Sequence, residues 1–212
     1  MSTGNANGND AMSPGATFER VYHELKRMLA EGELPPGSPI EPALIGQRIA
    51  ASITPIRDAL HRLTGERLVE APNHNGFRVP QLTEAALRDL YDWNAQLLRP
   101  ATRHIRPGSG ERVVSAAVAE EKDVATATAN LFIEIARATG SAEHVRAIQQ
   151  LNDRLAPFRR LEAVVLKCLD EEYRSLVSAI LAAEGPDLRR RLASYHRRRL
   201  GEVPALLAVA SP

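Results

Sequence analysis

The sequence predicts a mainly α-helical protein in two parts, and three observations support this fold class. Apolar residues recur at helical spacing through most of the 212 residues. Strand-like residues form two short runs, at residues 68–71 and 77–79. Glycine and proline clusters divide the rest of the chain into segments of helical length. We therefore expect three helices and a small β-hairpin over residues 17–80, followed by an antiparallel all-helical bundle over residues 81–212.

The composition limits the class of protein. Hydrophobic residues make up 44% of the chain and charged residues 25%, which is ordinary for a globular protein in water. Residues 1–16 are small and polar, unlike a secretion signal, and are expected to be a disordered tail. No apolar run approaches the ~18 residues that span a bilayer, so no membrane contact is expected. The single cysteine, Cys168, cannot form an internal disulfide, which favours a cytoplasmic protein, and its apolar run favours a core position over a reactive thiol.

The first two helices are predicted by apolar spacing and by the residues that end them. FERVYHELKRMLAE, residues 18–31, has apolar residues at helical intervals, and Gly32 with the LPPGSP turn ends it. EPALIGQRIAA is expected to be a second, shorter helix with Pro42 in its first turn. The apolar residues assigned to the buried sides of these helices are Val21, Leu25, Met28, Leu29, Leu44, Ile45 and Ile49.

The stretch SITPIRDALHRL, residues 52–63, predicts a third amphipathic helix. Thr54 suits the N-cap position, and Pro55 suits the first helical position, where its missing N–H costs nothing. Arg57 then lies in the first turn on the polar side, where a cation is mildly unfavourable for the helix dipole. A residue that is disfavoured locally yet points outward is a candidate for recognition. The buried stripe is expected to be Ile56, Ala59, Leu60 and Leu63.

The two strand-like runs flank residues 73–76, whose Asn and Gly tolerate the positive φ of a tight turn. Three helices and a hairpin in this order predict a winged helix-turn-helix, whose second motif helix enters the major groove of DNA. The wing tip reaches the phosphates or the minor groove. Plain surface and turn roles are the alternatives to DNA contact for Arg57, His74 and Asn75. The residues predicted to contact double-stranded DNA are Ser52, Thr54, Pro55, Arg57, His61, His74, Asn75 and Gly76.

These motifs, in this order and at this spacing, resemble the DNA-binding domain of the GntR family of bacterial transcription regulators. The resemblance runs over residues 21–80 and includes the LPPG turn, the TPIRDALHRL helix and the LVEAPNHNGF wing. Two positions depart from it, because relatives often have DNA-contacting arginines where this chain has Ala43 and Ile53. An arginine can make a bidentate contact with guanine and isoleucine cannot. We therefore expect an altered operator or weaker DNA binding.

Residues 82–200 resemble, more loosely, the FCD effector domain of the FadR subgroup of this family. The stretches that carry the resemblance begin at Arg88, Asn130 and Glu171 and read RDLYDWNAQLLRPATR, NLFIEIARATGSAEHV and EEYRSLVSAILAAEGPDLRRRLASYHRRRL. We expect a first helix capped by Thr83, one long helix over residues 113–139, and helices to about residue 160, over 161–183 and from Asp187 onward. The resemblance implies a homodimer, a palindromic operator and a small organic effector held by the helical domain.

Many FCD domains hold a divalent metal with one aspartate and three histidines, and the resemblance places these positions at Ala129, Ile133, Tyr173 and His196. Alanine and isoleucine have no donor atoms, so no metal and no other cofactor is expected. The remaining pocket is expected to be apolar and to take a larger or aromatic effector, and the alternative is a collapsed pocket without a ligand. Its expected lining is Trp93, Asn94, Ala129, Ile133, Tyr173 and His196.

The predicted function is a cytoplasmic, sequence-specific DNA-binding transcription regulator, with repression favoured over activation. The alternative is a helical adaptor or ligand-binding protein whose DNA-binding domain is weakened and non-specific. A catalytic function is disfavoured, because the nucleophile, phosphate-loop and zinc motifs GxSxG, GxxxxGKS/T and HExxH do not occur. The adjacent pairs Glu120–Glu121 and Glu171–Glu172 do not share a helix face, so they do not suggest paired catalytic carboxylates.

Overall fold

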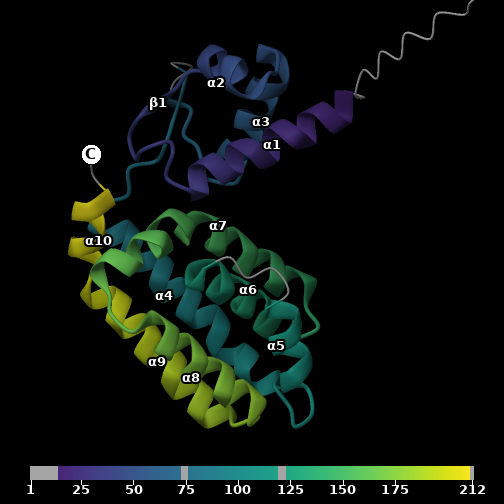
Figure 1. Ribbon diagram of the computed structural model, residues 1–212, viewed down its shortest axis with the longest axis vertical. Helices are drawn as coiled ribbons and strands as arrows, with labels where there is room; N and C mark the ends of the chain where they lie inside the picture. Colours follow the sequence, from purple (N-terminus) through teal and green to yellow (C-terminus); the bar gives the residue numbers. More distant parts are fainter. Residues whose placement is uncertain (1–13, 73–75, 119–122, 211–212) are drawn as a thin grey trace, which may run out of the picture.

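The computed structural model describes residues 14–72, 76–118 and 123–210, and its mainly helical architecture confirms the predicted fold class. Figure 1 shows an N-terminal domain lying against a larger helical bundle, with α1 facing α7. None of the described helices is long and apolar enough to cross a membrane. The elements are α1 (Pro14–Ala30), β1 (Pro39–Ile40), α2 (Pro42–Ile49), α3 (Ile53–Gly65), β2 (Phe77–Arg78), α4 (Glu84–Ala101), the 3₁₀ helix η2 (Thr102–His104), α5 (Gly110–Val118), α6 (Val124–Arg137), α7 (Ala142–Val165), α8 (Leu169–Leu181), α9 (Gly185–Gly201) and α10 (Val203–Ala210).

The helices of the N-terminal domain pack around one apolar core. Val21, Leu25 and Met28 of α1 are fully buried, as are Ile56 and Leu60 of α3, the helix against which α1 packs. Burying each such side chain stabilises a fold by about 1.5–3 kcal/mol. The spacing of apolar residues in the sequence therefore identifies the faces that form this core. Residues 1–13 of the expected tail lie outside the described residues, and α1 already begins at Pro14.

The turn between α2 and α3 is tight and requires a glycine. Ala50 adopts the left-handed conformation with φ 51°, and the Ala51 N–H donates to the Gly46 carbonyl at 3.0 Å. A β-carbon on Gly46 would lie 2.7 Å from the Ala51 carbonyl oxygen, closer than such atoms approach. Arg20 of α1 donates to the carbonyl of Ile49 at 3.0 Å and holds the end of α2. This turn fixes the direction in which α3 leaves α2.

The start of α3 differs from the prediction. Ser52, with an extended backbone, is the N-cap, and its side chain makes no capping hydrogen bond. Thr54 and Pro55 are therefore the second and third helical residues, and the assignment of Thr54 as N-cap was wrong. Pro55 still falls among the first four residues, whose N–H groups have no helical partner, so the proline remains harmless. Arg57 moves into the second turn, where the helix dipole acts on it more weakly.

The small sheet also has a different partner from the predicted one. β1 pairs with β2 in antiparallel register, Pro39 opposite Arg78 and Ile40 opposite Phe77. Of the run at residues 68–71, Glu70 alone joins the sheet, through a single bridge to Arg78. β1 could not be predicted from the sequence, because a strand of two residues is too short to show an alternating pattern. The proline-rich turn before it brings Pro39 alongside the wing strand.

The C-terminal domain is a bundle in which α4 contacts α6, α7, α9 and α10. Thr83 caps α4 as predicted, accepting a hydrogen bond from the Ala86 N–H at 3.2 Å. The single helix expected over residues 113–139 is instead α5 and α6, and Asp123 caps α6 by accepting from the Thr126 N–H at 2.8 Å. The boundary expected near residue 160 is absent, because α7 continues to Val165. The final helix, α10, was not predicted separately.

Cys168 is exposed, so its assignment to the core was wrong. The residue lies between α7 and α8 and takes the left-handed conformation with φ 58° at the N-cap of α8. Its neighbour Leu166 is buried instead. The apolar run around Cys168 therefore reflects the ends of two helices on either side of a turn, and not a continuous buried segment.

Candidate DNA-binding face and interdomain cleft

The N-terminal half of α3 presents most of the residues predicted to contact DNA on one exposed side. Ser52, Thr54, Arg57 and His61 are exposed, and Pro55 is half-buried. The His61 ring packs edge-on against Phe77 of β2 at 5.0 Å between centroids, which connects this side of α3 to the wing. The structure thus places these residues next to one another at the end of a helix-turn-helix that inserts into DNA in known examples.

Arg57 is the free cation of this face. Within the described residues it makes no hydrogen bond or ion pair. Its neighbours differ, since Arg62 pairs with Glu19 and Glu66, and Arg78 pairs with Glu70. An exposed guanidinium without an internal partner can contact a phosphate or a guanine without breaking an existing interaction.

The wing tip is described in part. His74 and Asn75 lie outside the described residues. Gly76 has φ 88°, a conformation that a residue with a side chain rarely adopts, and it leads directly into β2. Its place in the fold is therefore explained by backbone geometry, and its expected contact with DNA remains a prediction.

The residues expected to line an effector pocket do not form one group. Asn94 and His196 are buried and lie 3.0 Å apart, between Oδ1 and Nε2. Ala129 and Ile133 line the cleft described below, and Tyr173 lines a small adjoining cavity. Trp93 is 48% exposed and lies on another surface, beside Gly65 and Arg67. Asn94 thus lies inside the bundle, whereas Trp93, the preceding residue of α4, lies on its outer side.

His196 is a neutral histidine held inside the bundle. Burial, together with the nearby charges of Arg159 and Arg199, lowers its pKa to about 4, against the opposing effect of its bond to Leu192. The neutral ring has a single N–H, which Nδ1 donates to the Leu192 carbonyl at 2.7 Å. Nε2 is then an acceptor, so the Asn94 amide is expected to turn its NH₂ toward the ring. Within the described residues, no group of three or more His, Cys, Asp or Glu side chains is arranged to hold a metal.

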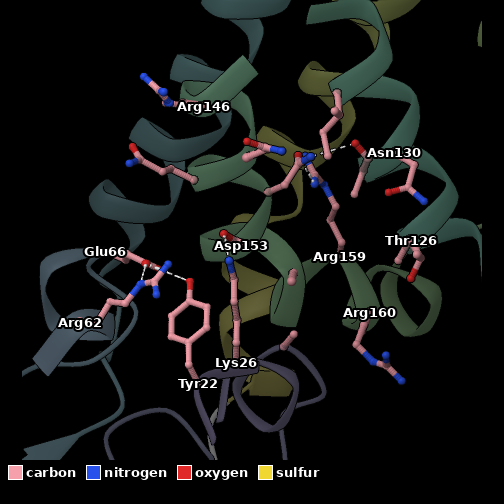
Figure 2. Close-up of a pocket in the computed structure, with 18 residues that line it drawn as sticks. Tyr22, Lys26, Arg62, Glu66, Thr126, Asn130, Arg146, Asp153, Arg159 and Arg160 are labelled. Atoms are coloured by element: carbon pink, nitrogen blue, oxygen red, sulfur yellow. Dashed lines mark hydrogen bonds and ion pairs between the residues drawn. The ribbon is translucent and has the colours of Figure 1, made fainter. Parts of the chain in front are cut away.

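A cleft of about 670 Å³ separates the N-terminal domain from α6 and α7. Figure 2 shows Tyr22 and Lys26 of α1, Arg62 of α3 and the C-cap residue Glu66 on one side, with Asp153 and Arg159 of α7 on the other. The domains are joined across it by an ion pair between Lys26 Nζ and Asp153 Oδ2 at 2.5 Å. Burial lowers the pKa of Lys26, but Asp153 raises it more, so the ammonium stays charged.

The lining of this cleft is mixed, with charged and amide side chains beside apolar residues such as Ala129 and Ile133. Asn152 donates to the Ala129 carbonyl at 2.8 Å, and its Oδ1 accepts from Nη1 of Arg159 at 2.7 Å. Sequence reasoning missed Arg159, because APFRRLEAVV resembles the exposed face of an amphipathic helix. The sequence did contain a signal for the burial of Arg159, namely its spacing from Leu155, Phe158 and Glu162. These three residues are buried on the same side of α7.

Comparison with known proteins agrees with this geometry. A family model described as bacterial regulatory proteins of the gntR family matches residues 17–79. Over these residues the chain is similar to the gntR family, and we call this part the gntR domain. The HTH-type transcriptional repressor GlaR of Escherichia coli (strain K12) is 34% identical over 76 residues, which cover 36% of this chain and 34% of that repressor. The match therefore spans about a third of the length of this relative.

Two further relatives extend along the chain beyond the gntR domain. The probable D-xylose utilization operon transcriptional repressor of Paenarthrobacter nicotinovorans is 27% identical over 204 residues, covering 88% of this chain and 90% of that protein. The crystal structure of a putative transcriptional regulator GntR from Rhodococcus sp. RHA1 superposes with a TM-score of 0.73 at 15% identity, covering 89% and 97% of the two chains. The likeness in fold therefore includes both domains.

The surface of the gntR domain carries exposed apolar side chains on α2 and α3. Ala43 and Ile53, the two positions where the sequence resemblance implies arginines, are both exposed, Ile53 by 49%. Leu44 is 57% exposed, so its assignment to the buried side of α2 was wrong. Ile45 and Ile49 bury the inner side of this short helix without it. Large apolar side chains at this surface can contact thymine methyl groups in the major groove.

Proposed function

We propose that this protein is a sequence-specific DNA-binding regulator of transcription, acting in the cytoplasm as a repressor and without catalytic activity. The observation that carries the proposal is the exposed N-terminal half of α3, where Arg57 has no partner among the described residues, in the gntR domain. The names of the relatives support it, since GlaR and the D-xylose operon protein are both described as transcriptional repressors.

We further propose that the protein acts as a homodimer on a palindromic operator. A two-fold protein places two recognition helices about one helical turn of DNA apart, so its site repeats in inverted orientation. The exposed Leu181 and Val164 of the bundle are apolar surface that such an assembly can cover. Sedimentation of the purified protein tests the assembly, and a monomer at micromolar concentration would contradict it.

An effector that binds beside α6 and α7 is the proposed control of DNA affinity. The cleft touches both domains, so a ligand there contacts the gntR domain and the bundle together. A ligand changes DNA affinity only if it binds one arrangement of the domains better than another, and a cleft between domains meets this condition. The effector domain subgroup implied by the sequence resemblance, FCD of the FadR type, is part of this proposal.

Selection of random duplex DNA by the purified protein tests the DNA-binding proposal. The native protein is expected to recover a palindromic site, and Arg57→Ala is expected to lose about 1–3 kcal/mol of discrimination at one base pair of each half-site. Arg112→Ala, which removes an exposed arginine on α5, is the matched control and is expected to recover the same site. Binding of all sequences alike, with no site selected, would instead favour the adaptor function.

A further inference from the structure

Arg159 is a buried arginine with an incomplete set of partners. Its side chain is 2% exposed, and Nη1 donates to Asn152 Oδ1 at 2.7 Å. Nε and Nη2 have no hydrogen-bond partner among the described residues, and no carboxylate of that part of the chain pairs with the guanidinium. Such a group is costly to bury, because a desolvated charge without a counterion destabilises a fold.

Arg199, in the same bundle, shows how a buried guanidinium is satisfied here. It is also 2% exposed, and Glu162 Oε2 accepts from its Nε at 3.1 Å and from its Nη2 at 2.9 Å. Its Nη1 reaches Glu172 at 2.6 Å. Glu162 is three residues from Arg159 but is engaged with Arg199 and with the Tyr91 hydroxyl. Among the described residues, two carboxylates therefore bind Arg199 and none binds Arg159.

The two unpartnered nitrogens of Arg159 are the ones that form a fork. Nε–H and Nη2–H point the same way from one edge of the guanidinium plane, and this edge binds the Glu162 carboxylate in Arg199. A planar pair of donors matches the two oxygens of a carboxylate or a phosphate. The Phe132 ring lies 5.3 Å from the Arg159 carbon Cζ and supports one face of the plane. The vacant edge is therefore held in a fixed orientation.

The surroundings of Arg159 favour a negative ligand. The cleft has room for an organic molecule of moderate size, at about 670 Å³. Its walls carry five cationic side chains against the carboxylates of Glu66 and Asp153. The cations are Lys26, Arg62, Arg146, Arg159 and Arg160. In Figure 2 Arg160 and Arg146 lie at opposite ends of this wall, with Arg159 between them. The excess of positive charge raises the local concentration of anions.

We propose that Arg159 anchors an anion-binding site in the interdomain cleft, and that the ligand is an organic anion whose carboxylate or phosphate binds the Nε–Nη2 edge. Asn152 holds the guanidinium from the other side. The next residue of α7, Asp153, pairs with Lys26 of the gntR domain. Arg159 lies less than two helical turns from Asp153 along α7. A ligand at Arg159 therefore binds close to the contact between the domains. The inference rests on the proposed function, because it names the chemical class of the effector.

Calorimetric titration of the full chain with citrate, benzoate, glucose 6-phosphate and inorganic phosphate tests the site. At least one probe is expected to bind, and Arg159→Gln is expected to weaken that binding at least tenfold. Arg112→Gln removes an exposed arginine of α5 that lies outside the cleft lining and is the matched control, with an expected change under threefold. Arg159→Lys keeps the charge without the fork and is expected to bind at least fivefold more weakly, which covers a failure of Arg159→Gln to fold. Binding of carboxylates alone or phosphates alone identifies the group at the fork.

Two results would overturn the proposal: no probe binds the native protein, or the Arg159 variants bind as the native protein does. The same preparations are to be tested for operator selection. An operator without anion binding leaves the proposed function standing and removes this inference. Anion binding through Arg159 without any selected operator supports the site and removes the proposed function.

Discussion

At the scale of single residues, Ile53 stands where the sequence resemblance implies an arginine. This difference has the clearest expected consequence for the DNA sequence that the protein selects. It is the first residue of α3 and is half exposed. An aliphatic side chain reads a thymine methyl group, whereas arginine reads the O6 and N7 atoms of guanine. Ile53→Arg is therefore expected to change one base pair of each selected half-site to guanine, a preference worth about 1–3 kcal/mol. Selection with Ile53→Ala is the comparison, and an unchanged consensus in Ile53→Arg would show that the side chain does not face a base.

The buried imidazole of His196 gives the protein a stability that depends on pH. Its pKa is about 4 in the folded chain, because of burial and the charges of Arg159 and Arg199, against about 6.5 when unfolded. Between these two pH values the unfolded state binds a proton at His196 and the folded state does not. The free energy of unfolding therefore falls as the pH drops from about 6.5 to 4. The full loss is roughly 3 kcal/mol. Urea unfolding across this range is expected to show a shallower pH dependence in His196→Gln, and equal slopes would contradict the assignment.

At the scale of elements, the helices were largely predictable and the short connections were not. The core positions of α1 and α3 follow a strong helical period, so local pattern and tertiary packing agree. β1 has two residues and no period, so nothing local connects Pro39 and Ile40 to the wing. α6 begins at Val124 in sequence that suits a helix on both sides, and the Asp123 cap at its start did not stand out from the alanine-rich pattern.

The candidate sites show the same division. The exposed side of α3 was predictable, because it lies opposite a clear apolar stripe. Arg159 was not, because a charged residue next to another arginine is usually solvated. Its burial depends on how α7 packs against α6, a contact between helices that spacing along one helix does not reveal.

The tight joint between α2 and α3 can be tested with glycine replacements. Gly46→Ala places a β-carbon 2.7 Å from the Ala51 carbonyl, so the two helices must separate. We expect it to lower the free energy of unfolding by about 1–3 kcal/mol, as overpacking does, and to weaken operator binding by changing the angle of α3. Gly65→Ala, at the end of α3 with open space around its position, is the matched control. It is expected to leave stability equal or up to about 1 kcal/mol higher.

At the scale of the whole molecule, α7 is the element through which the two domains meet. It packs on α6 and α4 inside the bundle and on α1 of the gntR domain. Asn152 and Arg159 face the bundle interior and the cleft, while Asp153 reaches across to Lys26. Any shift of α7 that follows ligand binding therefore acts on the contact that holds the gntR domain. A helix that belongs to both contacts can link them without a change in the fold of either domain.

The energy of this link can be measured with a double-mutant cycle on Lys26→Ala and Asp153→Ala. The pair is less than a third exposed at both ends, so we expect a favourable coupling of roughly 1 kcal/mol in urea unfolding. The Arg146–Glu143 pair, exposed and within α7 alone, is the control and is expected to couple by about 0.3 kcal/mol or less. Both interdomain variants are also expected to bind the operator with an affinity that depends less on the cleft ligand, because α7 then shifts without moving α1. Equal couplings for the two pairs, with an undiminished ligand response, would show that α7 does not transmit the effect of the ligand through this contact.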